Sequence, residues 1–117
     1  MGPSGLLTLF ERYTEHARAL RDRYADRIEL IIGFETERLP PEDWASRMRE
    51  IRERAGFEYY VGSVHDVDGD VIDFSADKTA EVAEKVGGRD ALHRRYFEAV
   101  AEVVTTLRPE VVGHLDL

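Results

Sequence analysis

Apolar residues recur every three or four positions in three parts of the chain, the spacing that gathers them on one face of an α-helix. These patterns cover residues 6–24, 41–55 and 90–107, and charged side chains fill the opposite faces. A shorter helix is expected over 75–86, because Ser75 can cap its start and Gly87 and Gly88 follow its end. The predicted buried stripes are Leu6, Phe10, Tyr13, Ala17, Leu20 and Tyr24; Trp44, Met48, Ile51 and Ala55; and Leu92, Tyr96, Val100, Val103 and Leu107.

The second of these helices carries clear start and stop signals. Pro41 stands where the first turn of a helix favours proline, and Glu42 and Asp43 suit the positive end of the helix dipole. Gly56 is typical of the residue that ends a helix. We therefore expect this helix to begin near residue 41 and to end at residue 55.

Short apolar runs lie between the helices and predict three strands. The first lies in "RIELIIGFETE", with Ile28, Leu30, Ile31 and Ile32, and the others lie in "FEYYVGSVH" and "EVVGHLDL". A nearly continuous run such as the first is typical of a strand buried on both faces, as in a parallel sheet. "DVDGDVIDF" over residues 66–74 predicts a turn or hairpin around Asp68 and Gly69.

The order of elements predicts an α/β fold of one domain, in which three parallel strands alternate with helices. Three strands make a small sheet, and neither its first nor its last strand has an evident outer partner. The chain of 117 residues therefore has the pattern of an arc taken from a larger α/β structure.

Composition narrows the classes of partner. The chain has 16 Lys and Arg residues against 24 Asp and Glu residues, a net charge of −8, which disfavours nucleic acid and anionic membrane as partners. It has no cysteine, so disulfides and thiolate metal sites are excluded. No apolar run approaches the roughly 20 residues of a membrane span. "MGPSGLLTLF" lacks the basic segment of a signal peptide, so we expect a cytoplasmic protein.

Three metal-competent side chains follow the three predicted strands. Glu35 follows "IELIIGF", His65 follows "YYVGSV", and His114 follows "EVVG". Functional sites in α/β sheets form at the carboxyl ends of the strands, and imidazole and carboxylate suit zinc, manganese or iron. A single histidine at a strand end is more often a hydrogen-bonded turn residue, and Glu35, with Glu37 nearby, could simply be solvated. The coincidence at three strand ends favours a metal site.

Other motifs are weaker. His16 and His93 fall within predicted helices and are expected on the surface. "DVDGD" resembles the start of a calcium loop, but its glycine comes too early and Asp77 stands where the loop needs Glu. "VGG" at 86–88 lacks the glycine spacing of a phosphate-binding loop. There is no GxSxG motif and no cysteine nucleophile.

The segments "IELIIGFETE", "YYVGSVHDVDGDVIDF" and "PEVVGHLDL" together resemble the histidinol-phosphatase branch of the PHP (polymerase and histidinol phosphatase) family. The order and spacing match from about residue 10 onward, and "GSVH" with the loop after it is the most specific part. The resemblance implies part of a distorted (βα)7 TIM-like barrel that holds up to three divalent metal ions. It also implies hydrolysis of a small phosphate ester, histidinol phosphate, in histidine biosynthesis.

Carried over by residue, the resemblance makes Glu35 a metal ligand that often bridges two ions, and makes His65 and His114 ligands of one of those ions. Glu35 and His65 would be catalytic. Ser63 and Asp66 would flank the site, where they contact phosphate or order the ligands, and Asp116 lies in the matched motif.

The chain also departs from the family pattern. The H-x-H strand and the S-D-H motif that precede these segments in the family are absent, and so is the final D-x-H strand. We therefore interpret residues 1–117 as a partial PHP domain that corresponds to the middle of a histidinol-phosphatase. Such a segment could self-associate or be completed by another chain. The alternatives are a non-catalytic metal-binding or interaction module, and another PHP phosphoesterase, which the acidic charge disfavours.

Overall fold

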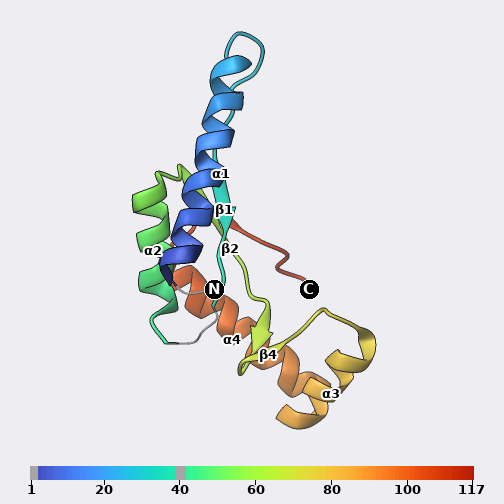
Figure 1. Cartoon of the computed structure of the whole chain (residues 1–117). Helices are drawn as coiled ribbons and strands as arrows, with labels where there is room; N and C mark the ends of the chain where they lie inside the picture. The colour runs from blue at the N-terminus through green and yellow to red at the C-terminus, as the bar shows by residue number, and fades with distance from the viewer. Residues whose placement is uncertain (1–2, 39–41) are drawn as a thin grey trace.

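The computed structural model describes residues 3–38 and 42–117, and it has four helices and five short strands within these ranges (Figure 1). In chain order the elements are α1 (Pro3–Arg23), β1 (Gly33–Glu35), α2 (Trp44–Ala55), β2 (Tyr59–Gly62), β3 (Asp66–Val67), β4 (Asp70–Val71), α3 (Ala76–Val86), α4 (Arg89–Leu107) and β5 (Val111–Val112).

The strands form a parallel sheet and a separate hairpin. The sheet has the order β1-β2-β5, and its register pairs Glu35 with Val61 and Val61 with Val111. β3 and β4 are antiparallel around Asp68 and Gly69, both of which have positive φ, as a tight hairpin turn requires. The predicted α/β fold with three parallel strands between helices is confirmed. The described residues do not close into a barrel, because β1 and β5 are both edge strands.

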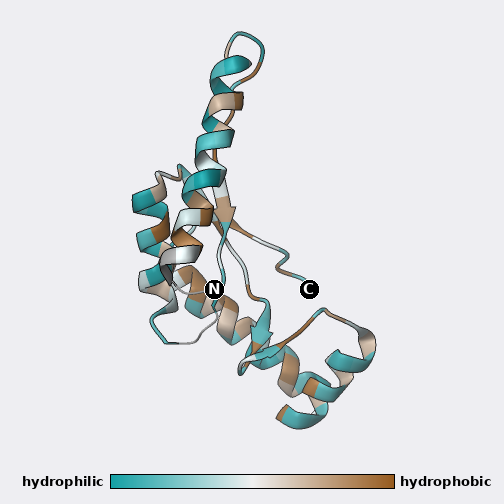
Figure 2. Ribbon diagram, viewed as in Figure 1, coloured by the Kyte–Doolittle hydropathy of each residue, from teal (hydrophilic) through white to brown (hydrophobic). Residues whose placement is uncertain are grey.

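The hydrophobic core lies between one face of the sheet and the helices. Phe34 of β1 and Tyr60 of β2 are buried there, and the Tyr60 hydroxyl donates a hydrogen bond of 2.7 Å to the carbonyl of Leu107 at the end of α4. Phe10 from α1 packs edge-on against Phe34. Figure 2 shows brown hydrophobic bands at β1 and along α4, in agreement with this core. The predicted stripes of α2 and α4 are buried in full.

The first predicted strand is placed differently. β1 covers Gly33–Glu35, downstream of the apolar run, and Ile28 and Ile31 are 55% and 61% exposed. The expectation of burial on both faces was therefore wrong, and only Ile32 of that run, with Phe34 after it, enters the core. The physical reason is that this run precedes an edge strand, and no strand among the described residues pairs with the outer side of β1.

The far end of α1 is also more exposed than its apolar stripe predicted. Leu6, Phe10 and Ala17 pack against the core, whereas Tyr13, Leu20 and Tyr24 are exposed. Figure 1 shows why, since the second half of α1 and the turn after it project beyond the sheet. Amphipathic spacing identified the helix correctly, but it could not indicate how far a partner surface extends.

The helix ends agree with the sequence signals except at the start of α2. That helix begins at Trp44, with Asp43 as its N-cap in a left-handed conformation, and the predicted role of Pro41 lies outside the described residues. Gly56 ends α2 at φ 75°, and the Ser75 hydroxyl caps α3 by accepting a hydrogen bond of 3.1 Å from the Lys78 amide. None of the helices described is both long enough and apolar enough to cross a membrane.

Candidate metal site

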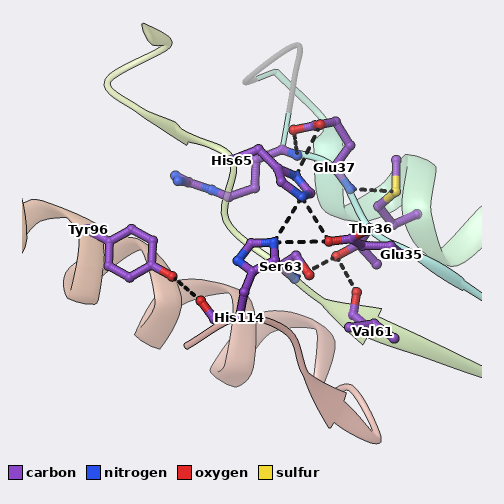
Figure 3. A network of polar contacts seen from close by, with 10 residues as sticks. Glu35, Thr36, Glu37, Val61, Ser63, His65, Tyr96 and His114 are labelled. Carbon is purple, nitrogen blue, oxygen red and sulfur yellow. Dashed lines mark hydrogen bonds and ion pairs between the residues drawn. The ribbon is translucent and has the colours of Figure 1, made fainter. Parts of the chain in front are cut away.

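Glu35, His65 and His114 converge at one end of the parallel sheet (Figure 3). Nε2 of His65 lies 2.8 Å from Oε1 of Glu35, and Nε2 of His114 lies 3.1 Å from the same oxygen. The two Nε2 atoms are 3.3 Å apart. The three side chains are one third to one half exposed, so the cluster is open to solvent. The prediction that three strand-end residues share one rim is confirmed as a matter of placement.

The register of the sheet produces this convergence. Glu35 is the last residue of β1, His65 follows β2, and His114 follows β5. Because the three strands are parallel and adjacent, their carboxyl ends lie at the same edge. Residues separated by 79 positions in the sequence, Glu35 and His114, are thereby brought into contact.

Thr36 fastens the ends of β1 and β2 together. Its side chain is buried, and both its amide and its hydroxyl donate to the carbonyl of Val61, at 2.9 and 3.0 Å. The same hydroxyl accepts a hydrogen bond of 3.3 Å from the amide of Ser63. This arrangement holds the backbone on either side of Glu35 and His65 in a fixed relation.

His114 is held through its own backbone. Its carbonyl accepts hydrogen bonds from the Tyr96 hydroxyl of α4, at 2.8 Å, and from the Leu117 amide, at 3.2 Å. Its φ of 24° lies in the left-handed region, which turns the chain immediately after β5. α4 therefore positions His114 even though His114 belongs to the segment after that helix.

The spacing of the three donor atoms fits a metal ion. Tetrahedral ligands about 2.0–2.1 Å from zinc lie roughly 3.3 Å from one another, and octahedral ligands at a similar distance lie about 2.8–3.0 Å apart. The observed separations of 2.8, 3.1 and 3.3 Å fall in this range. Two imidazoles and one carboxylate are also a donor set that zinc, manganese and iron accept.

The electrostatics of the cluster favour a cation. Burial raises the pKa of Glu35, but Ser63 beside it and the imidazoles of His65 and His114 together outweigh that effect, so the pKa is lowered. Glu35 is therefore a carboxylate near neutral pH. If both histidines also present unprotonated Nε2 atoms, three electron pairs face one another, and a shared positive charge is needed to make the arrangement favourable.

The other predicted site residues, Ser63, Asp66 and Asp116, lie in three different surroundings. Ser63 lies next to Glu35, yet its hydroxyl is buried without a well-formed hydrogen bond. Asp66 is buried and turned into the hairpin, where Oδ2 accepts from the Gly69 amide and Oδ1 lies 3.7 Å from Arg38. Asp116 is exposed and does not join the donor group of the described residues, although its charge acts on Tyr96.

The remaining sequence candidates are placed at the surface. His16 and His93 are exposed on α1 and α4, as predicted. The acidic residues of "DVDGD" serve the hairpin: Asp68 pairs with Arg95 at 2.7 Å, and Asp70 pairs with Lys85 at 2.9 Å. The carboxylates that a calcium loop would use as ligands are therefore paired with basic side chains.

Two residues beside the cluster were not predicted to take part in the site. Glu37 places Oε2 3.3 Å from Nδ1 of His65, on the opposite side of the imidazole from Glu35. Tyr96 was predicted only as a core residue of its helix, but its hydroxyl holds His114. The spacing of Glu37 two residues after Glu35 was a usable signal, because alternate residues of an extended chain point the same way.

Two curated relatives match this chain. A protein of Schizosaccharomyces pombe named "Probable histidinol-phosphatase" is 35% identical over 116 residues, which cover 98% of this chain and 38% of that protein. The histidinol-phosphatase of Saccharomyces cerevisiae is 32% identical over 120 residues, which cover 96% of this chain and 35% of that protein. No family model matches the chain, and no solved structure matches it significantly.

These matches confirm the resemblance to histidinol-phosphatases that the sequence motifs indicated. The chain spans little more than one third of the length of the curated relatives it matches, which is consistent with a segment from the middle of such a protein.

Proposed function

We propose that this chain forms part of the active site of a metal-dependent phosphomonoesterase that hydrolyses histidinol phosphate in histidine biosynthesis. Glu35, His65 and His114 would hold a divalent ion, with zinc, manganese and iron as the candidates. The proposal extends to this chain what the names of its two relatives state of them.

The observation that carries the proposal is the meeting of one carboxylate and two imidazoles at ligand-to-ligand distances, at the carboxyl end of a parallel sheet. Nothing in the packing of the core requires this meeting, because all three side chains lie outside the hydrophobic cluster. Turn residues satisfied by their own backbone would not need to approach one another across three strands.

A bound divalent ion supplies a Lewis acid that neutralises charge on phosphate oxygens and lowers the pKa of a water molecule. The protein residues have the task of holding the donors still. Thr36 fixes the strand ends, and Tyr96 fixes the turn that carries His114. A phosphate dianion would approach an acidic chain of net charge −8, so the ion also provides the local positive charge that the substrate needs.

The donor set of the described residues suffices for one ion with open positions. We propose that residues 1–117 are a partial PHP domain, and that the family's H-x-H and D-x-H motifs would add the further ligands from another segment or chain. The second candidate function is a metal-binding module without activity of its own. The outer edges of β1 and β5, which no other strand among the described residues pairs with, favour that reading.

The proposed function is tested by phosphate release from histidinol phosphate, with zinc or manganese present. We expect any release to disappear in His65→Ala and to persist in His93→Ala, which removes an exposed histidine of α4 as a matched control. A simple phosphodiester assayed in parallel tests the other PHP phosphoesterase reading. A folded, metal-loaded chain without activity would support the module reading instead.

The ligand assignment has a separate test in metal content. Equilibrium dialysis followed by elemental analysis should find less bound zinc or manganese in His65→Ala and in His114→Ala than in the unmodified chain. His93→Ala should bind as the unmodified chain does. Unchanged metal content in both site variants would refute the assignment, whatever the activity.

A further inference from the structure

The imidazole of His65 lies between two carboxylates. Its Nε2 atom faces Oε1 of Glu35 at 2.8 Å, and its Nδ1 atom faces Oε2 of Glu37 at 3.3 Å. Nδ1 is buried and has no other polar neighbour at hydrogen-bonding geometry. The contact with Glu37 is itself long and off the ideal angle, so it is not a full hydrogen bond in this structure.

Glu37 is anchored from several sides. Its Oε1 accepts a hydrogen bond of 3.0 Å from the Arg38 amide, which leaves Oε2 directed at His65. Its own amide contacts Sδ of Met48, a buried residue of α2, at 3.5 Å. The backbone amide and one carboxylate oxygen of Glu37 are therefore held in place, although its side chain is 45% exposed.

Arg38 links the segment that carries Glu37 to Asp66, the residue that follows His65. Its guanidinium lies 3.7 Å from Oδ1 of Asp66, the residue after His65, and 3.1 Å from Glu102 of α4. The backbone that carries Glu37 is thus linked to the backbone that carries His65 through the Arg38–Asp66 pair. This linkage limits how far Glu37 can move from Nδ1.

We propose that Glu37 is a positioning residue that raises the share of His65 with its proton on Nδ1, the form whose Nε2 electron pair faces Glu35 and His114. A neutral imidazole carries one N–H, and the hydrogen-bond partners of its two nitrogens decide which nitrogen keeps it. A carboxylate accepts and cannot donate, so Glu37 favours the form with the proton on Nδ1, whereas Glu35, 2.8 Å from Nε2, favours the other form when no ion is present. The significance for metal binding rests on the proposed function, whereas the choice of protonated nitrogen does not.

The alternative form would disable the donor set. With the proton on Nε2, His65 would donate to Glu35, and the two would satisfy each other without an ion. Glu37 would then face an Nδ1 electron pair at 3.3 Å, which is repulsive. The other titratable or charged groups near the imidazole are Glu35, His114, and Arg38 with its partner Asp66. None of them reaches Nδ1.

The experiment compares Glu37→Ala, Glu37→Gln and the control Glu53→Ala, which removes an exposed carboxylate of α2. Heteronuclear NMR of the imidazole nitrogens in the metal-free chain reports which nitrogen of His65 is protonated. We expect the same share of His65 with its proton on Nδ1 in the unmodified chain and in Glu53→Ala, and a similar share, through its amide oxygen, in Glu37→Gln. In Glu37→Ala we expect the proton to shift toward Nε2.

Zinc affinity, measured by competition with a chelator, gives the second readout. We expect Glu37→Ala to lose about 10–100-fold in affinity, the usual effect of removing such a partner, and Glu37→Gln to lose much less. A His65 tautomer balance that Glu37→Ala leaves unchanged would overturn the proposal. A chain in which Glu37→Ala shifts that balance but which binds no zinc would refute the proposed metal site and leave the role of Glu37 standing.

Discussion

A methyl group at position 113 would collide with the Ser63 hydroxyl and would lie 2.8 Å from Cγ1 of Val61. Gly113 is therefore the point of closest approach between the end of β5 and β2, directly before His114. We expect Gly113→Ala to push β5 away from β2, to destabilise the chain by about 1–3 kcal/mol as overpacking does, and to weaken metal binding. Urea unfolding and chelator competition measure the two effects.

A second variant tests the cause of this effect. Ser63→Gly in the Gly113→Ala background removes one of the two colliding groups, so part of the lost stability should return. If the double variant is no more stable than the sum of the two single effects predicts, the close approach of Gly113 to Ser63 is not the reason for the destabilisation.

Tyr96 gives a prediction for alkaline pH. Burial, and after it the charge of Asp116, raises the pKa of the Tyr96 hydroxyl above its ordinary value of about 10. The folded state therefore holds this proton more tightly than the unfolded state does. The resulting stability is fully present below about pH 10 and is lost as the pH rises through the folded pKa.

Denaturant midpoints measured from pH 8 upward test this expectation. The fall above about pH 10 should be shallower in Tyr96→Phe than in the unmodified chain. At neutral pH the same variant should lose about 1 kcal/mol, since it removes the hydrogen bond to the His114 carbonyl. An alkaline fall of equal depth in both proteins would show that Tyr96 does not contribute to it.

At the residue scale, sequence reasoning found the donors but not their supports. Glu35, His65 and His114 could be predicted because each follows an apolar run, and parallel strands end together. Ser63 lies beside Glu35, and its predicted role toward phosphate or the ligands stays a prediction. The contacts of Glu37 and Tyr96 depend on the exact path of two turns, and no periodicity in the sequence encodes that path.

At the scale of elements, α4 packs against the middle strand of the sheet and against the hairpin. It carries six buried residues and contacts β2, β3 and α3. Val103 is 1% exposed and reaches the space beside Gly62 of β2, whereas its neighbour Val104 is 37% exposed. We expect Val103→Ala to lower the free energy of unfolding by about 2 kcal/mol, and Val104→Ala to have little effect.

Urea unfolding monitored by circular dichroism compares these two variants directly, because both make the same chemical change one position apart. Equal stabilities would contradict the packing of α4 described here. The helices as a class could be predicted from the sequence, since their stripes and caps are local signals. β1 was misplaced because the apolar run before it indicated burial, while its pairing with β2 is fixed by contacts far apart in the chain.

At the scale of the whole molecule, the sheet is open. A hollow of about 980 Å³ lies between α1 and the sheet, and its lining includes Leu9 and Tyr13 of α1 and Tyr59 and Val61 of β2. Ile28 and Ile31, in the segment between α1 and β1, are further exposed apolar side chains. An unpaired strand edge beside exposed apolar side chains promotes association.

We therefore expect the chain to associate as its concentration rises, as its open sheet pattern predicts. Sedimentation velocity should detect this, and Ile28→Ser with Ile31→Ser should reduce it without lowering stability, because both residues are more than half exposed. Phe74→Ser, at an exposed site before α3, is the control. A chain that stays monomeric throughout would contradict the expectation, and so would an effect of Phe74→Ser equal to that of the double variant.

Because β5 is short, its local opening would affect how long an ion stays at the site. This strand pairs with β2 through only two residues and one further hydrogen bond, of 2.9 Å, from the Gly113 amide to Gly62, and both of its valines are at least 40% exposed. Such a segment opens far more often than the whole chain unfolds. Each opening would withdraw His114 and leave Glu35 and His65 in place. The lifetime of an ion at this site would then depend on how often β5 opens. Hydrogen exchange at the Gly113 amide measures that opening.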